Sequence, residues 1–134
     1  ATPFTASGKD SPDKNKYPSY MAPDGENARG INAVRLLSTA NNLTIDKVIE
    51  LGYNHYLAAF DFLIPALLKD YDNDTDANRK ATLKEAIDLL RNWDKTSSVS
   101  SVATTIAIDW ANQLGQFVPR AETMEEGTNA IKRY

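Results

Sequence analysis

The sequence predicts an all-α fold of about five helices, preceded by an extended N-terminal arm. In five separate stretches, apolar residues recur three and four positions apart, which is the periodicity of helices with one buried side. No stretch shows the strict apolar–polar alternation of a half-buried strand, and no internal repeat stands out. The chain has 134 residues, enough for one domain with a real core.

The predicted arm covers residues 1–23. Proline prevents a long helix because it lacks the backbone N–H and clashes with the preceding turn. Four prolines punctuate this segment: Pro3, Pro12, Pro18 and Pro23. The arm also carries side chains more apolar than a solvated tail needs, namely Phe4, Tyr17, Tyr20 and Met21. We therefore expect the arm to lie on another surface, either of this protein or of a partner.

The first two helices have recognisable starts. The first is predicted from about Glu26 to Thr39, with Asp24 or Asn27 available as its N-cap. The second is predicted to begin after Thr44, whose hydroxyl can cap it. Asp46 would then lie in the first turn of the second helix, where the helix dipole favours an anion.

The third and fourth helices have the clearest apolar periodicity. The third is predicted from Asn54 to about Asp70, with a break or kink near Leu63-Ile64, because Pro65 costs about 3 kcal/mol in a helix interior. The fourth is predicted from about Asp76 to Asn92.

A fifth helix is predicted from about Ser101 to Leu114, and we expect Gly115 to end it. Trp93 and Trp110 lie on the apolar sides of the fourth and fifth helices and are interpreted as core residues. The predicted organisation is an arm at 1–23, a helical domain at 24–115 and a tail of uncertain structure at 116–134.

The composition excludes several kinds of site. The net charge of −3 indicates no broad basic surface for nucleic acid or anionic lipid. No apolar run approaches the roughly 18 residues that span a membrane. The absence of cysteine excludes disulfides, thiol catalysis and cysteine-bound metals, and a single histidine excludes a two-histidine metal site within the chain. We expect no cofactor and no bound metal.

Three weaker candidate sites have simpler structural explanations. His55 has no acid–base partner at recognisable spacing. Residues 72–76 resemble the start of a calcium loop, but Ala77 replaces the glycine of the turn and Leu83 replaces the bidentate glutamate. The serines of the loop before the fifth helix have no base nearby and are interpreted as loop and cap residues: Ser97, Ser98, Ser100 and Ser101.

Arg29 is the one candidate catalytic residue. It falls in the first turn of the first predicted helix, where the helix dipole disfavours a cation by under about 1 kcal/mol. The structural explanation is a solvated side chain, paired with Glu26 or Asp24. The functional explanation is that Arg29 interacts with a group outside its helix.

The order and spacing of several segments resemble part of the catalytic β chain of the penicillin acylase family, which belongs to the N-terminal nucleophile hydrolases. No single segment is specific, and the resemblance covers the chain from Ala1 to about Leu114. The segments are Thr2-Pro3-Phe4, Asn27-Ala28-Arg29-Gly30, Arg35-Leu36-Leu37, Leu43-Thr44-Ile45-Asp46, Leu63-Ile64-Pro65-Ala66-Leu67-Leu68, Leu89-Leu90-Arg91-Asn92-Trp93-Asp94 and Ala107-Ile108-Asp109-Trp110.

The resemblance implies a particular chemistry. In that family the first residue of the β chain is the nucleophile, its own α-amino group is the base, and an asparagine helps to form the oxyanion hole. That asparagine would lie just before a segment like Thr2-Pro3, and Ala1 has no side chain that could attack a carbonyl. Both groups are therefore expected outside this chain. By resemblance, Arg29 would reach toward the nucleophile and orient it or the oxyanion asparagine.

The resemblance also implies that the chain is an excised segment of a larger α/β hydrolase, inactive alone. We expect its partners to be the α chain and the rest of the β chain, its parent's substrate to be a small acyl amide, and its location to be periplasmic or secreted. The start at Ala1 without a methionine fits a processed or excised product. The alternative is a free-standing helical protein-interaction module whose acylase-like order is coincidental. An exposed apolar patch would favour the acylase hypothesis.

Overall fold

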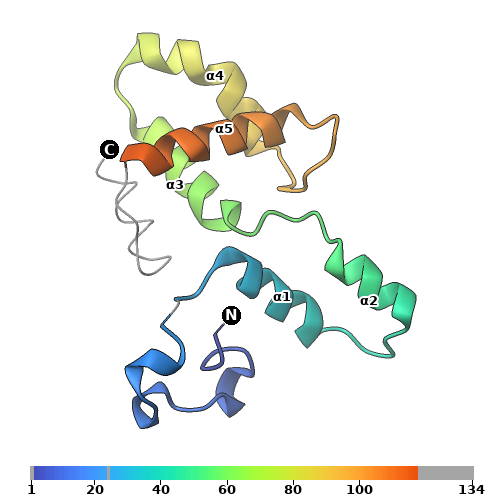
Figure 1. The fold of residues 1–134 in the computed structure, drawn as a ribbon. Helices are drawn as coiled ribbons and strands as arrows, with labels where there is room; N and C mark the ends of the chain where they lie inside the picture. The colour runs from blue at the N-terminus through green and yellow to red at the C-terminus, as the bar shows by residue number, and fades with distance from the viewer. Residues whose placement is uncertain (1, 24, 118–134) are drawn as a thin grey trace. The chain divides into compact units, whose positions relative to one another are not determined.

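The chain forms an all-α structure, as predicted. The computed structural model describes residues 2–23 and 25–117. These residues form five α-helices and three single-turn 3-10 helices, and the only β pairing among them is an isolated antiparallel bridge between Tyr56 and Thr96. The chain divides into two compact units, Ala1–Asn54 and His55–Tyr134 (Figure 1). The predicted boundaries of arm, helical domain and tail remain predictions, and the tail after Phe117 lies outside the described residues.

The N-terminal segment is folded into short turns, so the structure does not confirm an extended arm. It contains the 3-10 helices η1 (Gly8–Asp10), η2 (Lys14–Lys16) and η3 (Ser19–Met21). Asp13 caps η2 by accepting a hydrogen bond from the Asn15 backbone N–H at 3.0 Å. The Phe4 and Tyr17 rings lie with their centroids 5.6 Å apart. Prolines between the turns prevent them from merging into one helix.

Helices α1 (Ala28–Ser38) and α2 (Ile45–Gly52) complete the N-terminal unit. Thr44 caps α2, as predicted, by accepting a hydrogen bond from the Lys47 backbone N–H at 3.3 Å. The apolar side of α2 is exposed to solvent: Ile45 is 81% exposed, and Val48 and Ile49 are each 52% exposed. An eight-residue helix is marginal by itself in water, so α2 depends on its cap and its connections.

Helix α3 (Phe60–Asn73) differs from its prediction in two ways. It begins later, because the preceding residues pair with the α4–α5 loop: the Leu57 N–H donates to the Lys95 carbonyl at 2.8 Å, and the Ser97 N–H donates to the His55 carbonyl at 3.0 Å. Of the predicted break or kink near Leu63-Ile64, the break is wrong, since the helix continues through Pro65, and the kink stays a prediction.

Burial explains why α3 tolerates its proline. Pro65 itself is exposed, whereas its neighbours Ile64 and Ala66 are 3% and 8% exposed. A continuous helix keeps both neighbours in the apolar interior, and that burial offsets the lost hydrogen bond of the proline.

Helices α4 (Ala77–Arg91) and α5 (Val102–Phe117) form the rest of the C-terminal unit. Asp76 caps α4 by accepting hydrogen bonds from the Asn78 and Arg79 backbone N–H groups, each at 3.0 Å. The prediction that Gly115 ends the last helix is wrong, because α5 continues two residues beyond it. Glycine weakens a helix by about 1 kcal/mol but ends it only where the backbone turns left-handed.

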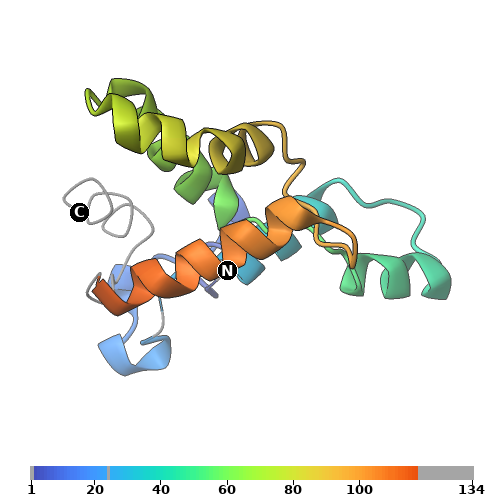
Figure 2. The same ribbon diagram turned by 90° about the horizontal axis from the view of Figure 1, so that it is seen from above.

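One apolar cluster holds α3, α4 and α5 together. Its buried members are Phe60, Ile64, Leu90 and Ala107, and both tryptophans pack against it, which confirms their interpretation as core residues. The Phe60 and Trp93 rings meet edge to face, with centroids 5.1 Å apart. Helix α4 contacts both α3 and α5. Figure 2 shows that α4 and α5 approach each other most closely near the loop that joins them.

No helix within the described ranges is long and apolar enough to cross a lipid bilayer.

Truncating Leu90 should destabilise the C-terminal unit. Leu90 is 3% exposed, so Leu90→Ala leaves a cavity in the cluster and should cost about 2–5 kcal/mol of unfolding free energy. The adjacent Leu89 is 39% exposed, and Leu89→Ala should cost under about 1 kcal/mol. Urea unfolding followed by circular dichroism would measure both. Equal losses for the two variants would contradict this description of the core.

Candidate functional site

The start of helix α1 holds the predicted site residue Arg29. Asn27 is the N-cap of α1: its backbone is extended, with φ −133°, and its side-chain oxygen accepts a hydrogen bond from the Gly30 N–H at 2.8 Å. This confirms one of the two predicted caps, whereas Asp24 lies outside the described residues. Arg29 is therefore in the first helical turn, and its side chain is exposed.

Arg29 does not form an ion pair with Glu26, one of the two partners that the structural explanation of this residue names. Across residues 2–23 and 25–117, no hydrogen bond or ion pair involves the Arg29 guanidinium. The Glu26 carboxylate, three residues earlier, accepts hydrogen bonds from the N-terminal segment instead. Arg29 is thus an exposed cation at the positive end of a helix dipole, and its five N–H donors have no acceptor among residues 2–23 and 25–117.

The N-terminal segment begins with a tight turn over Thr2–Thr5. The Thr5 and Ala6 backbone N–H groups donate to the Thr2 carbonyl at 3.1 Å and 3.0 Å. Pro3 occupies the second position of this turn, where its fixed φ is favourable. The turn brings the Thr2 and Thr5 hydroxyl oxygens to 3.1 Å from each other.

Glu26 joins this turn to the start of α1. Its Oε1 atom accepts a hydrogen bond from the Thr2 backbone N–H at 2.9 Å and another from the Thr5 hydroxyl at 2.5 Å. The Thr5 hydroxyl therefore lowers the pKa of the Glu26 carboxyl below its ordinary value, with the Thr2 N–H acting in the same direction. Hydrogen bonds to an ionised acceptor are the strong ones, so the contact is strongest while Glu26 is ionised.

Sequence reasoning did not identify Glu26 as an anchor for the N-terminal turn. It considered Glu26 only as a partner for Arg29. The turn itself is signalled locally, by a proline after Thr2, but its partner lies 21 residues beyond Thr5. Nothing in the sequence between them indicates that the two segments meet.

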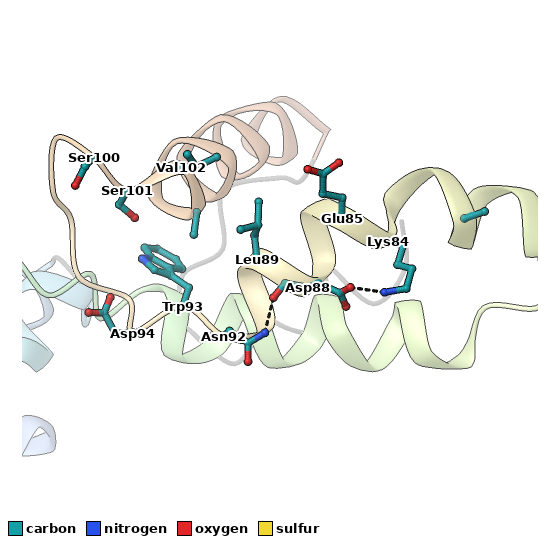
Figure 3. Close-up of a pocket in the computed structure, with 12 residues that line it drawn as sticks. Lys84, Glu85, Asp88, Leu89, Asn92, Trp93, Asp94, Ser100, Ser101 and Val102 are labelled. Atoms are coloured by element: carbon teal, nitrogen blue, oxygen red, sulfur yellow. Dashed lines mark hydrogen bonds and ion pairs between the residues drawn. The ribbon is translucent and has the colours of Figure 1, made fainter.

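A groove in the C-terminal unit lies between α4 and α5 (Figure 3). Leu89 projects from α4, and Trp93 from the loop just after it, toward Val102 on α5. Lys84 and Asp88 form an ion pair on α4. Among the residues lining this groove, the Ser101 hydroxyl lies 2.8 Å from the Thr104 hydroxyl and accepts a hydrogen bond from the Thr104 N–H. This confirms Ser101 as a helix cap.

The acidic segment between α3 and α4 uses its carboxylates internally. Asp72 pairs with Arg91 at 2.7 Å and Asp74 pairs with Arg79 at 2.5 Å, while Asp76 caps α4. The Arg79 side chain holds the pKa of Asp74 far below its usual range, and the Arg91 side chain lowers that of Asp72. Within the described ranges, no three metal-ligating side chains lie close enough together to hold an ion.

A second polar cluster, also missed by sequence reasoning, lies at the start of α3. Asp61 Oδ1 accepts hydrogen bonds from the Tyr56 hydroxyl at 2.5 Å and from Lys95 Nζ at 2.8 Å. Lys95 has a left-handed backbone, with φ +60°. Its hydrogen bond to Asp61 raises the pKa of the lysine, so the amine stays protonated and is a poor nucleophile. The cluster therefore fastens the α4–α5 loop to α3.

His55 is exposed, and its backbone carbonyl takes part in the same connection between segments. No hydrogen bond to its imidazole occurs within residues 2–23 and 25–117. A general base must lie within hydrogen-bond distance of the group whose proton it takes, and no described residue lies in such a position relative to the His55 imidazole.

Comparison with known proteins identifies the family. The chain matches the family model of penicillin amidase over residues 3–133, and it therefore belongs to the penicillin amidase family. This confirms the resemblance in the sequence and places the chain among hydrolases that act on amide bonds. No solved structure matches the chain.

Removing the Thr5 hydroxyl should raise the pKa of Glu26. Thr5→Val keeps the shape of the side chain but removes the donor, so the pKa should return toward 4.5. In the unchanged chain the extra stability from the ionised carboxylate is fully present above the ordinary pKa of glutamate and is lost as the pH falls through the lowered pKa of the folded state. An NMR titration of the Glu26 carboxyl carbon measures both effects.

The matched control is Thr39→Val, because the Thr39 hydroxyl donates only to the Leu36 carbonyl. This variant should leave the titration of Glu26 unchanged. A Glu26 pKa that is the same in the Thr5→Val variant and the unchanged chain would show that the hydrogen bond is not formed in solution.

Proposed function

We propose that this chain is a helical segment of an acylase that hydrolyses an acyl amide through an N-terminal nucleophile outside these 134 residues. The supporting observation is the match to the penicillin amidase family over residues 3–133. A match of this extent makes a coincidental resemblance untenable, and nothing in the described structure independently favours a free-standing interaction module. The segment alone is inactive under this proposal, because it lacks the nucleophile and the oxyanion asparagine.

The proposed reaction has two covalent steps. The nucleophile, a serine or a related residue, attacks the amide carbonyl while its own α-amino group takes the proton. The C–N bond then breaks, the amine leaves with that proton, and water hydrolyses the acyl-enzyme to release the acid. Hydrogen-bond donors at the developing oxyanion stabilise the charge in each step.

Two features of the structure fit a segment of a larger protein. The hydroxyls of the α4–α5 loop serve as cap and loop groups, so they offer no competing nucleophile within the described residues. Helix α2 exposes Ile45, Val48 and Ile49, the kind of apolar patch expected where another part of the acylase packs. The proposed partners are accordingly the α chain and the rest of the β chain.

Arg29 is proposed to support the chemistry by orienting the nucleophile or the oxyanion asparagine. Its exposed guanidinium has no partner within the described ranges and carries donors in a planar fork, which suits a backbone or amide oxygen. The periplasmic or secreted location remains a proposal from the family alone. No cofactor is needed for the proposed steps.

The first experiment concerns the parent protein. An antibody raised against this chain captures the native protein from source cells, and mass spectrometry gives the masses and N-terminal residues of its subunits. We expect a longer chain that begins with serine, threonine or cysteine, bound to a second cleaved chain, and release of amine from a chromogenic acyl anilide. A single species with the mass of this chain and no hydrolysis would overturn the proposal.

Arg29→Ala in the purified parent should lower kcat by roughly 10²-fold, since misplacing a reacting group by about 1 Å costs that much. Arg29→Lys keeps the charge but loses the planar arrangement of donors, so its kcat should lie between that of the unchanged parent and that of Arg29→Ala. Lys47→Ala removes an exposed cation from the neighbouring helix and is the control. Steady-state hydrolysis of the same anilide measures all three. Full activity in Arg29→Ala would exclude the supporting role.

A further inference from the structure

Glu26 links the Thr2–Thr5 turn to the start of α1, where Arg29 lies. It immediately precedes the N-cap Asn27, so it lies within one helical turn of Arg29. A glutamate three residues before an arginine commonly forms an ion pair on a helix surface. Here its Oε1 atom instead accepts from the Thr2 N–H and the Thr5 hydroxyl. The carboxylate therefore connects the first described residue of the chain to the helix end that carries Arg29.

The hydrogen bond to Thr2 constrains the main chain itself. A backbone N–H belongs to a planar peptide group, so an acceptor that fixes the N–H also fixes the orientation of that group. The Thr2 N–H points to both Glu26 Oε1 and Thr5 Oγ1, at 2.9 Å and 3.0 Å. The orientation of the Thr2 N–H is thus held by one carboxylate and by the turn attached to it.

We propose that Glu26 is a positioning residue of the acylase, which sets the main chain entering Thr2 at a defined place relative to Arg29. This inference rests on the proposed function, under which the oxyanion asparagine of the parent lies just ahead of the segment that begins at Thr2. The carboxylate does not touch the substrate. It acts through the Thr2–Thr5 turn, by keeping that turn attached to the start of α1.

The two hydrogen bonds to Oε1 limit which side chains at position 26 can replace glutamate. The Thr2 N–H and the Thr5 hydroxyl are both uncharged donors, so a neutral oxygen at the place of Oε1 can accept from them as well. Glutamine has the same length and an amide oxygen that can accept both hydrogen bonds, although less strongly than a carboxylate. Aspartate keeps the charge but is one methylene shorter. Glu26→Gln should therefore preserve the positioning better than Glu26→Asp.

The experiment measures kcat and KM for an acyl anilide with the complete parent enzyme and its variants. Glu26→Ala should lower kcat about 10–100-fold with KM changed less than about threefold, since misplacement slows the chemical steps more than it weakens substrate binding. Glu26→Gln should recover most of the lost kcat. The control Glu50→Ala removes an exposed carboxylate from α2 and should leave both constants unchanged.

Thr5 provides an independent test that removes no charge. Thr5→Val should lower kcat by a smaller factor, and Thr5→Ser should restore it, because serine keeps the hydroxyl donor. In the Glu26→Ala background, Thr5→Val should have no further effect, since the hydrogen bond is already lost. If Glu26→Ala fails to fold or to mature, two other comparisons still test the positioning role. They are Thr5→Val against Thr5→Ser, and Glu26→Gln against Glu26→Asp.

The outcomes separate this inference from the proposed function. Loss of kcat in Glu26→Ala or Glu26→Asp, with recovery in Glu26→Gln, supports it. Unchanged kcat in Glu26→Ala and Thr5→Val within an active parent overturns the inference alone. An unmodified parent that fails to hydrolyse any acyl amide overturns the proposed function and this inference together. A Glu26→Gln variant as slow as Glu26→Ala would show that charge, rather than hydrogen-bond positioning, matters.

Discussion

The burial of a small apolar cluster is the constraint on which the described fold depends. Helices of eight to sixteen residues are marginal in water unless they pack. In the C-terminal unit, Phe60, Ile64, Leu90 and Ala107 supply that packing, and their burial even keeps α3 intact through a proline. In the N-terminal unit, none of the described residues is buried. That unit relies on caps, turns and polar contacts between side chains.

This difference bears directly on the candidate site, because the site lies in the unit without a buried core. The start of α1 is defined by the Asn27 cap, and the N-terminal turn is attached to it by Glu26. Hydrogen bonds are directional and each contributes only about 0.5–1.5 kcal/mol, so such a unit is well oriented but weakly stabilised. Under the proposed function, the rest of the acylase would pack against the exposed apolar side of α2 and add to the stability of this unit.

The sequence predicted features that depend on near neighbours better than features that depend on distant ones. The caps Asn27 and Thr44 were predicted because a cap binds backbone groups two or three residues away. Continuation of the helices through Pro65 and Gly115 was not, because their local cost is offset elsewhere in the fold. The Asp72–Arg91 pair joins residues 19 apart and has no local signal.

The sequence by itself determined the all-α class, the approximate helix ranges, the membership of the penicillin amidase family and the place of Arg29 in a first helical turn. These follow from periodicity, capping and the order of motifs, which are properties of adjacent residues. Only the tertiary structure decided that Glu26 binds the N-terminal turn rather than Arg29, and that Asp61 binds both Tyr56 and Lys95. A carboxylate can accept from any donor that the fold brings within about 3 Å, and the fold, not the spacing in the chain, selects that donor.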